Sequence, residues 1–581
     1  MDSNLLKTKS VEQLVGDVEH GGKSLRRTLS ALDLTLLGIG AIIGTGIFVL
    51  TGTAAANQAG PGIVLSYVLA GTACGFAALC YAEFAAMIPI AGSAYTYSYA
   101  TLGEIFAWMI GWDLILEYAV GSMTVAVGWS GYFQQILLGF GVHLPAWMSA
   151  APGTQIVMPG GAVETAVFNL PAILIVLAIM CVLIVGIRES ARANTIIVLI
   201  KLAVVVFFIV VGVGYVKPAN WSPFAPYGWA GIMSGAAVVF FAYIGFDAVS
   251  TTAEEAKNPA RDMPIGIITS LIVCTVLYLV VAAILSGIIP VLEYKTNAQF
   301  LNAPVGYAMQ VVGKNWAAGI VSAGAVAGIT SVLLVMLMSQ PRIFFSMSRD
   351  QLLPAGVSKV HPRFRTPYIT TAITCVVVAG VAGFVPIQTL SEMTSIGTLF
   401  AFVVVSLAVP ILRARRPDVH RPFRVPGGPV LPVLGVLSCV YLMLSLSVMT
   451  WVRFLGWLDI GMLIYWFYGR THSTLVDPAE TAARTTGQGI ANFVTIMGAL
   501  ATFNGLSIAV LGFLTTSGVT TESLAKWHEL DTLIRPLGLH ISAAIADRFG
   551  LMCLGIGIAV LLVGLLLRKA TSRPAVGAGR R

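Results

Sequence analysis

Three ionisable side chains inside long apolar segments are the first residues of this chain that could do chemistry. Lys201 stands in NTIIVLIKLAVVVF, Asp247 in FFAYIGFDAVS and Glu117 in GWDLILEYAVG. If these segments cross a membrane, each ionisable group costs about 2.5–3.5 kcal/mol, so each needs a functional or a structural reason. The structural alternatives are snorkelling of Lys201 to the cytoplasm, helix capping by Asp247 and pairing of Glu117 with a partner.

Backbone groups form a second kind of candidate site. The stretch GIGAIIGTGIFVLTG, residues 38–52, contains five glycines, although each glycine inside a helix costs about 1 kcal/mol relative to alanine. One interpretation is close helix packing through the GxxxG pair Gly40 and Gly44. The other is a break at Gly44-Thr45-Gly46. Such a break would free amides for a carboxylate and carbonyls for an ammonium group or a cation.

A second interrupted segment supports the break. The sixth apolar run has Gly245 in its middle and Asp247 just after it. Two interrupted spans five apart are what an inverted repeat predicts, because a unit of five spans that is repeated once crosses in the opposite sense. We therefore expect the two breaks to face each other near the bilayer midplane, at a site for a small zwitterionic ligand.

The elements that position these groups are membrane-spanning helices. The chain has 581 residues, of which 57% are hydrophobic and 10% charged, against roughly 25% charged in soluble domains. Its apolar runs are too long and too uniform for the alternating pattern of a β-barrel. The sequence predicts an all-α polytopic membrane protein with about 14 spans. Their approximate limits are 33–53, 62–89, 106–139, 169–187, 194–216, 231–250, 264–290, 316–346, 368–385, 393–412, 430–451, 454–469, 488–516 and 550–567.

The placement of the basic residues predicts the orientation. Of the 34 Lys and Arg residues, 26 fall on one side of these spans, 7 on the other and Lys201 within a span. By the positive-inside rule both termini are cytoplasmic, and the loops 140–168 and 517–549 lie outside. The net charge of +8 is thus a topology signal, and nucleic acid is not expected as a partner.

Cysteines and histidines argue against an enzyme. All seven cysteines fall in spans without metal-ligand spacing, and all seven histidines fall in loops or tails. We expect the cysteines to be small packing residues, and we expect no cofactor and no metal.

Several motifs together resemble one transporter group. GIGAIIGTGIF, YAEFAAMIPIAGSAYTYSYATLGEIFAWMIGWDLILEYAVG, FFAYIGFDAVSTTAEEAKNPARDMPIGI and PRIFFSMSRDQLLP resemble the amino acid–polyamine–organocation superfamily. RPFRVPGGPVLPVLG and TWVRFLGWLDIGMLIYWFYGRTHS resemble its cationic amino acid transporter branch. The resemblance runs from about Leu25 to Ser473. It implies the leucine-transporter fold, with two inverted five-span repeats in which spans 1 and 6 unwind around the substrate.

This resemblance implies a domain organisation and roles for single residues. The expected segments are a cytoplasmic N-terminal segment 1–30, a first repeat 31–216, a second repeat 231–412, spans 11–12 at 430–470, additional spans 13–14 at 488–567 and a cytoplasmic tail 568–581. The implied substrate ligands are Ile42, Gly44, Thr45, Gly46, Phe241, Ala242 and Ile244. The amides of residues 44–46 would bind the substrate carboxylate. The substrate ammonium group would be bound by the carbonyls of Ile42, Phe241, Ala242 and Ile244, and the Phe241 ring would cap the pocket. For Phe241 and Ile244, lipid contact or core packing is the alternative.

The resemblance also suggests a driving ion. Sodium-coupled carriers of this fold hold an ion between spans 1, 5 and 8, whereas proton-coupled members place a lysine there. A buried lysine can lose its proton near neutral pH, so Lys201 is the candidate coupling group. Asp247 could share this proton, and Glu117 could line the proton path or a wall of the pocket.

We therefore expect a proton-coupled carrier of small neutral L-amino acids such as alanine, working by alternating access in a bacterial inner membrane. Alignment of Pro341-Arg342 in span 8 to the resembling branch implies that Met336 stands where cationic carriers have a smaller residue. A methionine there would shorten the pocket and leave a cationic head without partners. The alternatives are a cationic (arginine or lysine) transporter or exchanger, a non-transporting amino acid sensor, and a channel.

Overall fold

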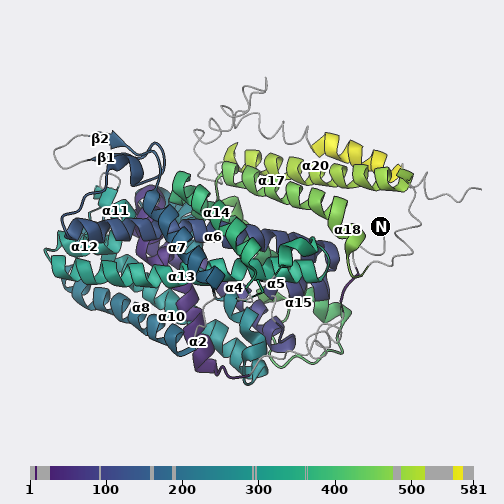
Figure 1. The fold of residues 1–581 in the computed structure, drawn as a ribbon, viewed down its shortest axis with the longest axis horizontal. Helices are drawn as coiled ribbons and strands as arrows, with labels where there is room; N and C mark the ends of the chain where they lie inside the picture. The colour runs from purple at the N-terminus through teal and green to yellow at the C-terminus, as the bar shows by residue number, and fades with distance from the viewer. Residues whose placement is uncertain are drawn as a thin grey trace, which may run out of the picture. The chain divides into compact units, whose positions relative to one another are not determined.

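The computed structural model describes residues 7–9, 27–90, 93–157, 163–185, 191–290, 293–294, 298–359, 361–362, 364, 366–475, 486–516 and 554–566. This part of the chain is almost entirely helical (Figure 1). It divides into two compact units. The first comprises Met1–Arg349 with Leu353–Leu446, and the second comprises Asp350–Leu352 with Ser447–Arg581. The candidate site lies wholly in the first unit.

The first unit contains most of the apolar helices. Its longer helices are α2 (Ala31–Ile42), α4 (Ile63–Met87), α5 (Ser93–Thr101), α6 (Glu104–Gly139), α7 (Leu170–Val185), α8 (Ala191–Gly212), α9 (Gly228–Val239), α10 (Pro259–Ile288), α13 (Asn315–Arg349), α14 (Tyr368–Phe384), α15 (Ile387–Arg415) and α16 (Val430–Leu444). Its short helices and turns are η1 (Gly46–Leu50), α3 (Thr51–Ala54), η2 (Ala55–Ala59), η3 (Gly60–Gly62), η4 (Ala146–Met148), η5 (Val213–Tyr215), η6 (Pro218–Trp221), η7 (Phe240–Tyr243), η8 (Asp247–Glu255), α11 (Ala298–Asn302), α12 (Pro304–Val311) and η10 (Ala355–Ser358).

The second unit continues the helical pattern. Its labelled helices are α17 (Val448–Ile464), η11 (Tyr465–Gly469), α18 (Arg470–His472) and α20 (Thr486–Thr516). A further apolar helix covers Leu554–Leu566. Within this unit the Asn504 side chain of α20 donates to the Asp459 carboxylate of α17 at 2.8 Å. A polar pair thus joins two apolar helices.

Nine helices in the described residues are long and apolar enough to cross a membrane, and five shorter apolar helices accompany them. The prediction of an all-α polytopic membrane protein is therefore confirmed. A described helix overlaps each apolar run of the sequence, but the number of fourteen spans stays a prediction.

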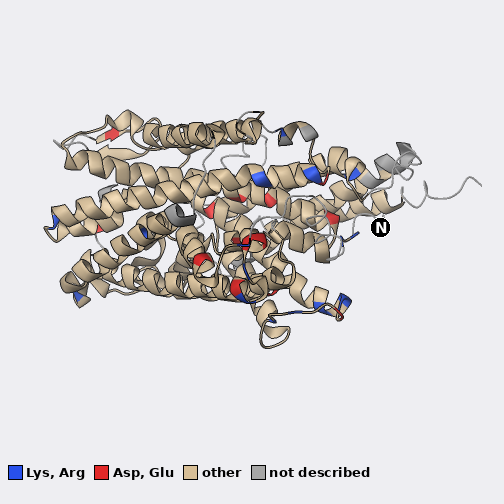
Figure 2. Ribbon diagram, turned by 60° about the horizontal axis from the view of Figure 1, so that its bottom comes forward, with Lys and Arg blue, Asp and Glu red and all other residues tan. Residues whose placement is uncertain are grey.

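The helices turn apolar side chains outward and polar ones inward. On α8, for example, Ile196, Leu199, Val206 and Val210 are exposed, while Lys201 is buried. This is the distribution expected where lipid replaces water around the bundle. Figure 2 shows how few charged residues the described helices carry, and the acidic residues Asp113, Glu117 and Asp247 are buried.

Spans 1 and 6 are both interrupted in the middle. Span 1 begins with a capping box, in which Ser30 and Asp33 bind each other's backbone amides. Its first half, α2, ends at Ile42, and a π-helical turn resumes at Gly46. Span 6 changes from α9 to the 3₁₀ turn η7, breaks at Ile244–Phe246 and continues as the 3₁₀ helix η8.

A small hairpin interrupts the long loop between α6 and α7. Strands β1 (Gln155–Val157) and β2 (Val163–Thr165) pair antiparallel, with Ile156 opposite Glu164. This hairpin was not expected from the sequence. Asn169 ties the end of this loop to the bundle, because its side-chain oxygen accepts from the Ser130 hydroxyl at 2.7 Å and from the Ala172 amide.

The predicted segments can be compared only in part. The helices of the second repeat extend slightly beyond 231–412, from Gly228 to Arg415. Most of 1–30, the loop 517–549 and the tail 568–581 lie outside the described residues. The division into repeats, and the orientation of the loop 140–168, stay predictions.

Candidate functional site at two helix breaks

The interrupted segments of spans 1 and 6 lie directly against each other. A Cβ atom added to Gly46 would meet Cα and Cβ of Ala242 at 2.4 Å. A Cβ on Gly245 would come within 2.8 Å of the Ala41 carbonyl carbon, and Gly245 has a φ of +122°, which disfavours any side chain. Glycine at these positions therefore allows backbone-to-backbone contact between the breaks, as expected from the sequence.

A tyrosine from α10 bridges the two breaks. The Tyr278 hydroxyl lies 2.9 Å from the Ile42 carbonyl oxygen and 2.8 Å from the Ala242 carbonyl oxygen. These are two of the carbonyls that were expected to receive an ammonium group. A hydroxyl has one proton to donate, so it bonds one carbonyl at a time while remaining close to the other. In this structure the Tyr278 hydroxyl therefore lies within hydrogen-bond distance of both carbonyls and satisfies one of them at a time.

Lys201 reaches the end of α2 from α8. Its Nζ atom donates to the Gly40 carbonyl at 2.7 Å and to the Ile43 carbonyl at 3.3 Å. A Cβ on Gly328 of α13 would touch the lysine stem at 3.1 Å. Lys201 is only 1% exposed, so its side chain does not snorkel to the membrane surface. It lies between spans 1, 5 and 8, where the resemblance placed a coupling lysine.

The three residues of the first break have different surroundings. Gly44 packs against Val332 of α13, at 3.1 Å from a built Cβ. The Thr45 side chain fills the space over Gly128 of α6, and its buried hydroxyl has no hydrogen-bond partner in the described structure. The Gly46 carbonyl accepts from the Tyr67 hydroxyl at 3.3 Å.

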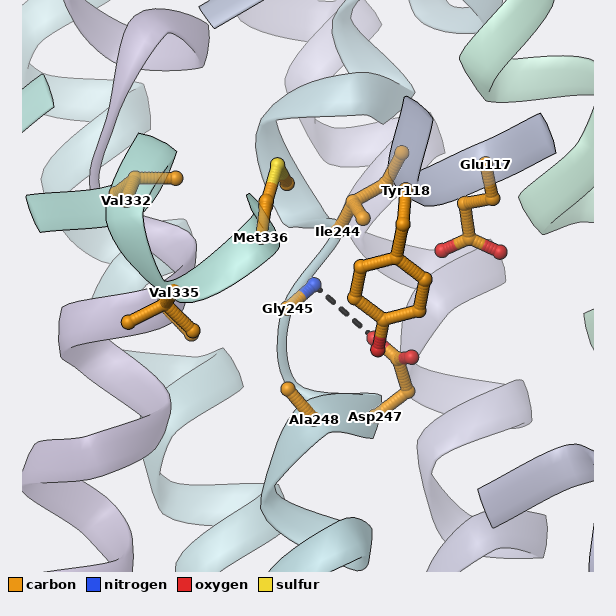
Figure 3. Close-up of a pocket in the computed structure, with 10 residues that line it drawn as sticks. Glu117, Tyr118, Ile244, Gly245, Asp247, Ala248, Val332, Val335 and Met336 are labelled. Carbon is orange, nitrogen blue, oxygen red and sulfur yellow. Dashed lines mark hydrogen bonds between the residues drawn. The ribbon is translucent and has the colours of Figure 1, made fainter. Parts of the chain in front are cut away.

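A narrow cavity of about 20 Å³ lies beside the breaks (Figure 3). Its lining residues are Ala41, Glu117, Tyr118, Ile244, Gly245, Asp247, Ala248, Val332, Val335 and Met336. This volume holds about one water molecule. The helices around the breaks must therefore separate before anything as large as an amino acid can enter.

Two carboxylates line this cavity, those of Asp247 and Glu117. One oxygen of Asp247 accepts from the Gly245 amide at 3.1 Å, the contact drawn in Figure 3. Glu117 is buried, with Thr398 of α15 nearby. One helical turn earlier, Asp113 is fully buried, and its oxygens have no partner among the described side chains and backbone groups. No ion pair joins Asp247 to Lys201, although both are described.

The cavity contains only part of the residues expected from the sequence. Ile244, Met336, Asp247 and Glu117 line it, whereas Ile42, Gly44, Thr45, Gly46, Phe241 and Ala242 do not. Phe241 is buried within η7. Tyr118, Val332 and Val335 also line the cavity and were not expected from the sequence. The sequence did offer a signal for them, because Tyr118 follows Glu117 directly and Val332 and Val335 lie within one helical turn of Met336.

A second group of charged residues joins α4, α15 and the loop that follows α15. Glu83 of α4 forms a bidentate ion pair with Arg413 of α15 and accepts from the Val425 amide at 2.7 Å. Arg421 approaches the same carboxylate at 3.7 Å. One carboxylate thereby holds the loop after α15 against α4.

Comparison with known proteins extends these observations. The profile of a family described as amino acid permease matches residues 29–468. A methylthioribose transporter of Bacillus subtilis (strain 168) is 51% identical over 473 residues, which cover 81% of this chain and 99% of that protein. A branched-chain amino acid permease of the same strain is 53% identical over 475 residues, covering 82% and 100%. The vacuolar cationic amino acid transporter 4 of Arabidopsis thaliana is 32% identical over 618 residues, covering 84% and 100%.

Proposed function

This chain belongs to the amino acid permease family, and we propose that it is a secondary active transporter that moves small neutral L-amino acids such as alanine together with protons by alternating access. The observation that carries the proposal is Lys201, buried against the carbonyl end of α2 at the first break. No catalytic role and no cofactor is proposed.

Lys201 links proton and substrate in this proposal. When protonated, its Nζ donates to the Gly40 and Ile43 carbonyls and holds α2 in place. Loss of the proton to the cytoplasm would release those carbonyls and favour opening to the inside. Proton and substrate then act on one two-state element, which is the requirement for coupling. Glu117 and Asp113, one turn apart on α6, would line the proton path.

The substrate proposal rests on the walls of the cavity. Ile244, Val332, Val335 and Met336 make them apolar, while Asp247 already accepts a hydrogen bond from the Gly245 amide. A lysine or arginine head would meet mostly apolar walls there and would have to share or displace the contact of Asp247. The substrate ammonium would bind carbonyls of both breaks, and its carboxylate would bind backbone amides. The residues involved would include Ile42, Gly44, Thr45, Gly46, Phe241 and Ala242. The Tyr278 hydroxyl would first have to leave the Ile42 and Ala242 carbonyls.

Cationic amino acids are the second candidate substrate, because two carboxylates line the cavity and plant relatives are named cationic amino acid transporters. Larger neutral compounds are also candidate substrates, because two bacterial relatives are named a branched-chain amino acid permease and a methylthioribose transporter. A sensor without transport remains the alternative outside the carrier class.

We further propose a bacterial inner-membrane location with both termini in the cytoplasm. The segments 31–216 and 231–412 would be the inverted repeats, with spans 11–12 at 430–470 and spans 13–14 at 488–567 outside them. The support is the placement of basic residues in the sequence.

The decisive experiment is uptake into proteoliposomes under an imposed pH gradient without sodium. Labelled alanine, leucine, arginine and methylthioribose are tested separately. We expect alanine to accumulate, Lys201→Met to abolish accumulation while some exchange survives, and Lys217→Met, at an exposed lysine, to behave like the wild type. Uptake that requires sodium and ignores the pH gradient contradicts proton coupling. Binding without any flux supports the sensor.

The substrate range has its own test. Shortening Met336 to serine removes the apolar wall that lies against Ile244 in Figure 3. We expect Met336→Ser to admit arginine or lysine. A wild-type protein that already prefers arginine to alanine contradicts the argument from the cavity walls.

A further inference from the structure

A second cavity adjoins the central one, and Tyr118 lines both. It has a volume of about 110 Å³, several times that of the central cavity. Its polar lining includes Ser93, Tyr118, Thr251, Ser339, Arg342 and Ser346. These residues come from α5, α6, η8 and α13, so both the broken span 6 and its neighbours contribute.

The second cavity lies displaced from the first toward one end of the helices. Along α6 the lining moves back from Tyr118 to Leu114, whereas along η8 it advances from Ala248 to Thr251. Along α13 it advances from Met336 to Arg342. In the predicted topology, span 6 (α9 to η8) and span 8 (α13) cross the membrane in the direction opposite to span 3 (α6). A step backward along α6 and a step forward along η8 and α13 therefore lead to the same side. In the orientation proposed above this is the cytoplasmic side.

The polar groups of this cavity suit an anion. Arg342 stands at its exposed mouth, and in the described part of the chain no carboxylate forms an ion pair with it. Ser93 is 3% exposed, and its hydroxyl has no hydrogen-bond partner among the described residues. Ser93 has a φ of +50°, a conformation uncommon outside glycine. A guanidinium opposite a buried hydroxyl offers the donors that a carboxylate accepts.

We propose that this cavity is an exit site, which binds the carboxylate of an amino acid after it has left the central cavity. Tyr118 forms the partition between the two, Arg342 pairs with the carboxylate, and Ser93 donates a hydrogen bond to it. The inference rests on the proposed transport of amino acids. It adds a second substrate-binding site, on the inner side, to the one at the helix breaks.

The test compares the two faces of the transporter in right-side-out and inside-out membrane vesicles. Alanine exchange gives the half-saturating concentration at each face. A hydrogen bond to a charged group contributes about 1.5–3 kcal/mol, so we expect Arg342→Gln to raise the value at the inner face about tenfold or more. The outer value should stay unchanged. Arg342→Lys should recover part of the loss, and Ser93→Ala should raise the inner value less.

Ser339→Ala is the matched control. Ser339 lines the same cavity, but its hydroxyl donates within α13 to the Val335 carbonyl at 2.8 Å. We expect this variant to match the wild type at both faces.

Two results overturn the exit site while leaving transport intact. One is an unchanged inner half-saturation in Arg342→Gln and in Ser93→Ala. The other is an equal rise at both faces, which would mean that Arg342 affects the conformational change as a whole. If Arg342→Gln does not fold, Ser93→Ala and Arg342→Lys decide the question. A wild-type protein that moves no amino acid at all refutes the proposed function instead.

Discussion

A methyl group added at Gly46 tests the contact between the two breaks most directly. In the Gly46→Ala variant the new Cβ would lie 2.4 Å from both Cα and Cβ of Ala242 and 3.3 Å from its nitrogen. Ordinary contacts of a Cβ atom begin at 3.4 Å. One of the clashing atoms belongs to the backbone, so rotating a side chain cannot relieve the overlap. Span 1 and span 6 must instead move apart by about an ångström.

The size of the effect follows from this geometry. Overpacking a dense interior costs about 1–3 kcal/mol. If that cost falls on the closed arrangement of the breaks, the population of the closed arrangement relative to open ones drops by about 5- to 140-fold. Gly75 of α4 gives the control, because a Cβ there meets nothing within 4 Å. Gly75→Ala should be neutral or stabilise by up to about 1 kcal/mol, the difference in helix propensity.

The assay combines transport with stability. Alanine uptake and thermal unfolding in detergent are measured for the wild type, Gly46→Ala and Gly75→Ala. We expect Gly46→Ala to insert into the membrane but to show strongly reduced uptake and a lower melting temperature. Wild-type uptake together with a wild-type melting temperature in Gly46→Ala would refute the close approach of the two breaks.

Three further variants test other parts of the structure. Tyr278→Phe leaves two buried carbonyls without their shared hydroxyl, which should cost about 1–3 kcal/mol; an unchanged melting temperature would contradict the bridge. Glu83→Gln breaks a buried ion pair, which should cost about 3–5 kcal/mol, whereas Asp418→Asn, at an exposed pair with Arg416, should unfold like the wild type. Cysteine at the exposed Glu164 of β2 should react with an impermeant thiol reagent in intact cells; labelling only after permeabilisation would reverse the proposed orientation.

Local patterns in the sequence were enough to predict the helices and the breaks. Long apolar runs can be satisfied only as helices in a membrane, and glycine with polar neighbours marked both interruptions. The position of Lys201 between spans 1, 5 and 8 followed from the family resemblance together with its depth in an apolar run. The structure shows Lys201 at that position, bonded to the Gly40 and Ile43 carbonyls.

Contacts between distant segments could not be predicted in the same way. Tyr278 covers the Ile42 and Ala242 carbonyls, and nothing in either break indicates which distant hydroxyl reaches them. Asp247 binds the amide of Gly245 next to it and is not paired with Lys201. Tyr118 lies in a predicted helix, but only the packing of α6 against span 6 makes it a shared wall of two cavities. Side-chain direction, which depends on tertiary packing, decided each of these cases.

The place where Lys201 meets α2 has an electrical consequence. Lys201 lies about 13 Å along its helix from Arg192, near the middle of a hydrocarbon layer about 30 Å thick. A full crossing of the membrane by one charge is worth about 2.3 kcal/mol per 100 mV, so a proton that reaches Lys201 from outside gains roughly half of that. In a respiring cell the transmembrane voltage would therefore help to load this lysine even when no pH gradient exists. The carbonyl end of α2 is the negative end of its dipole, and it would retain the proton until the inner side opens.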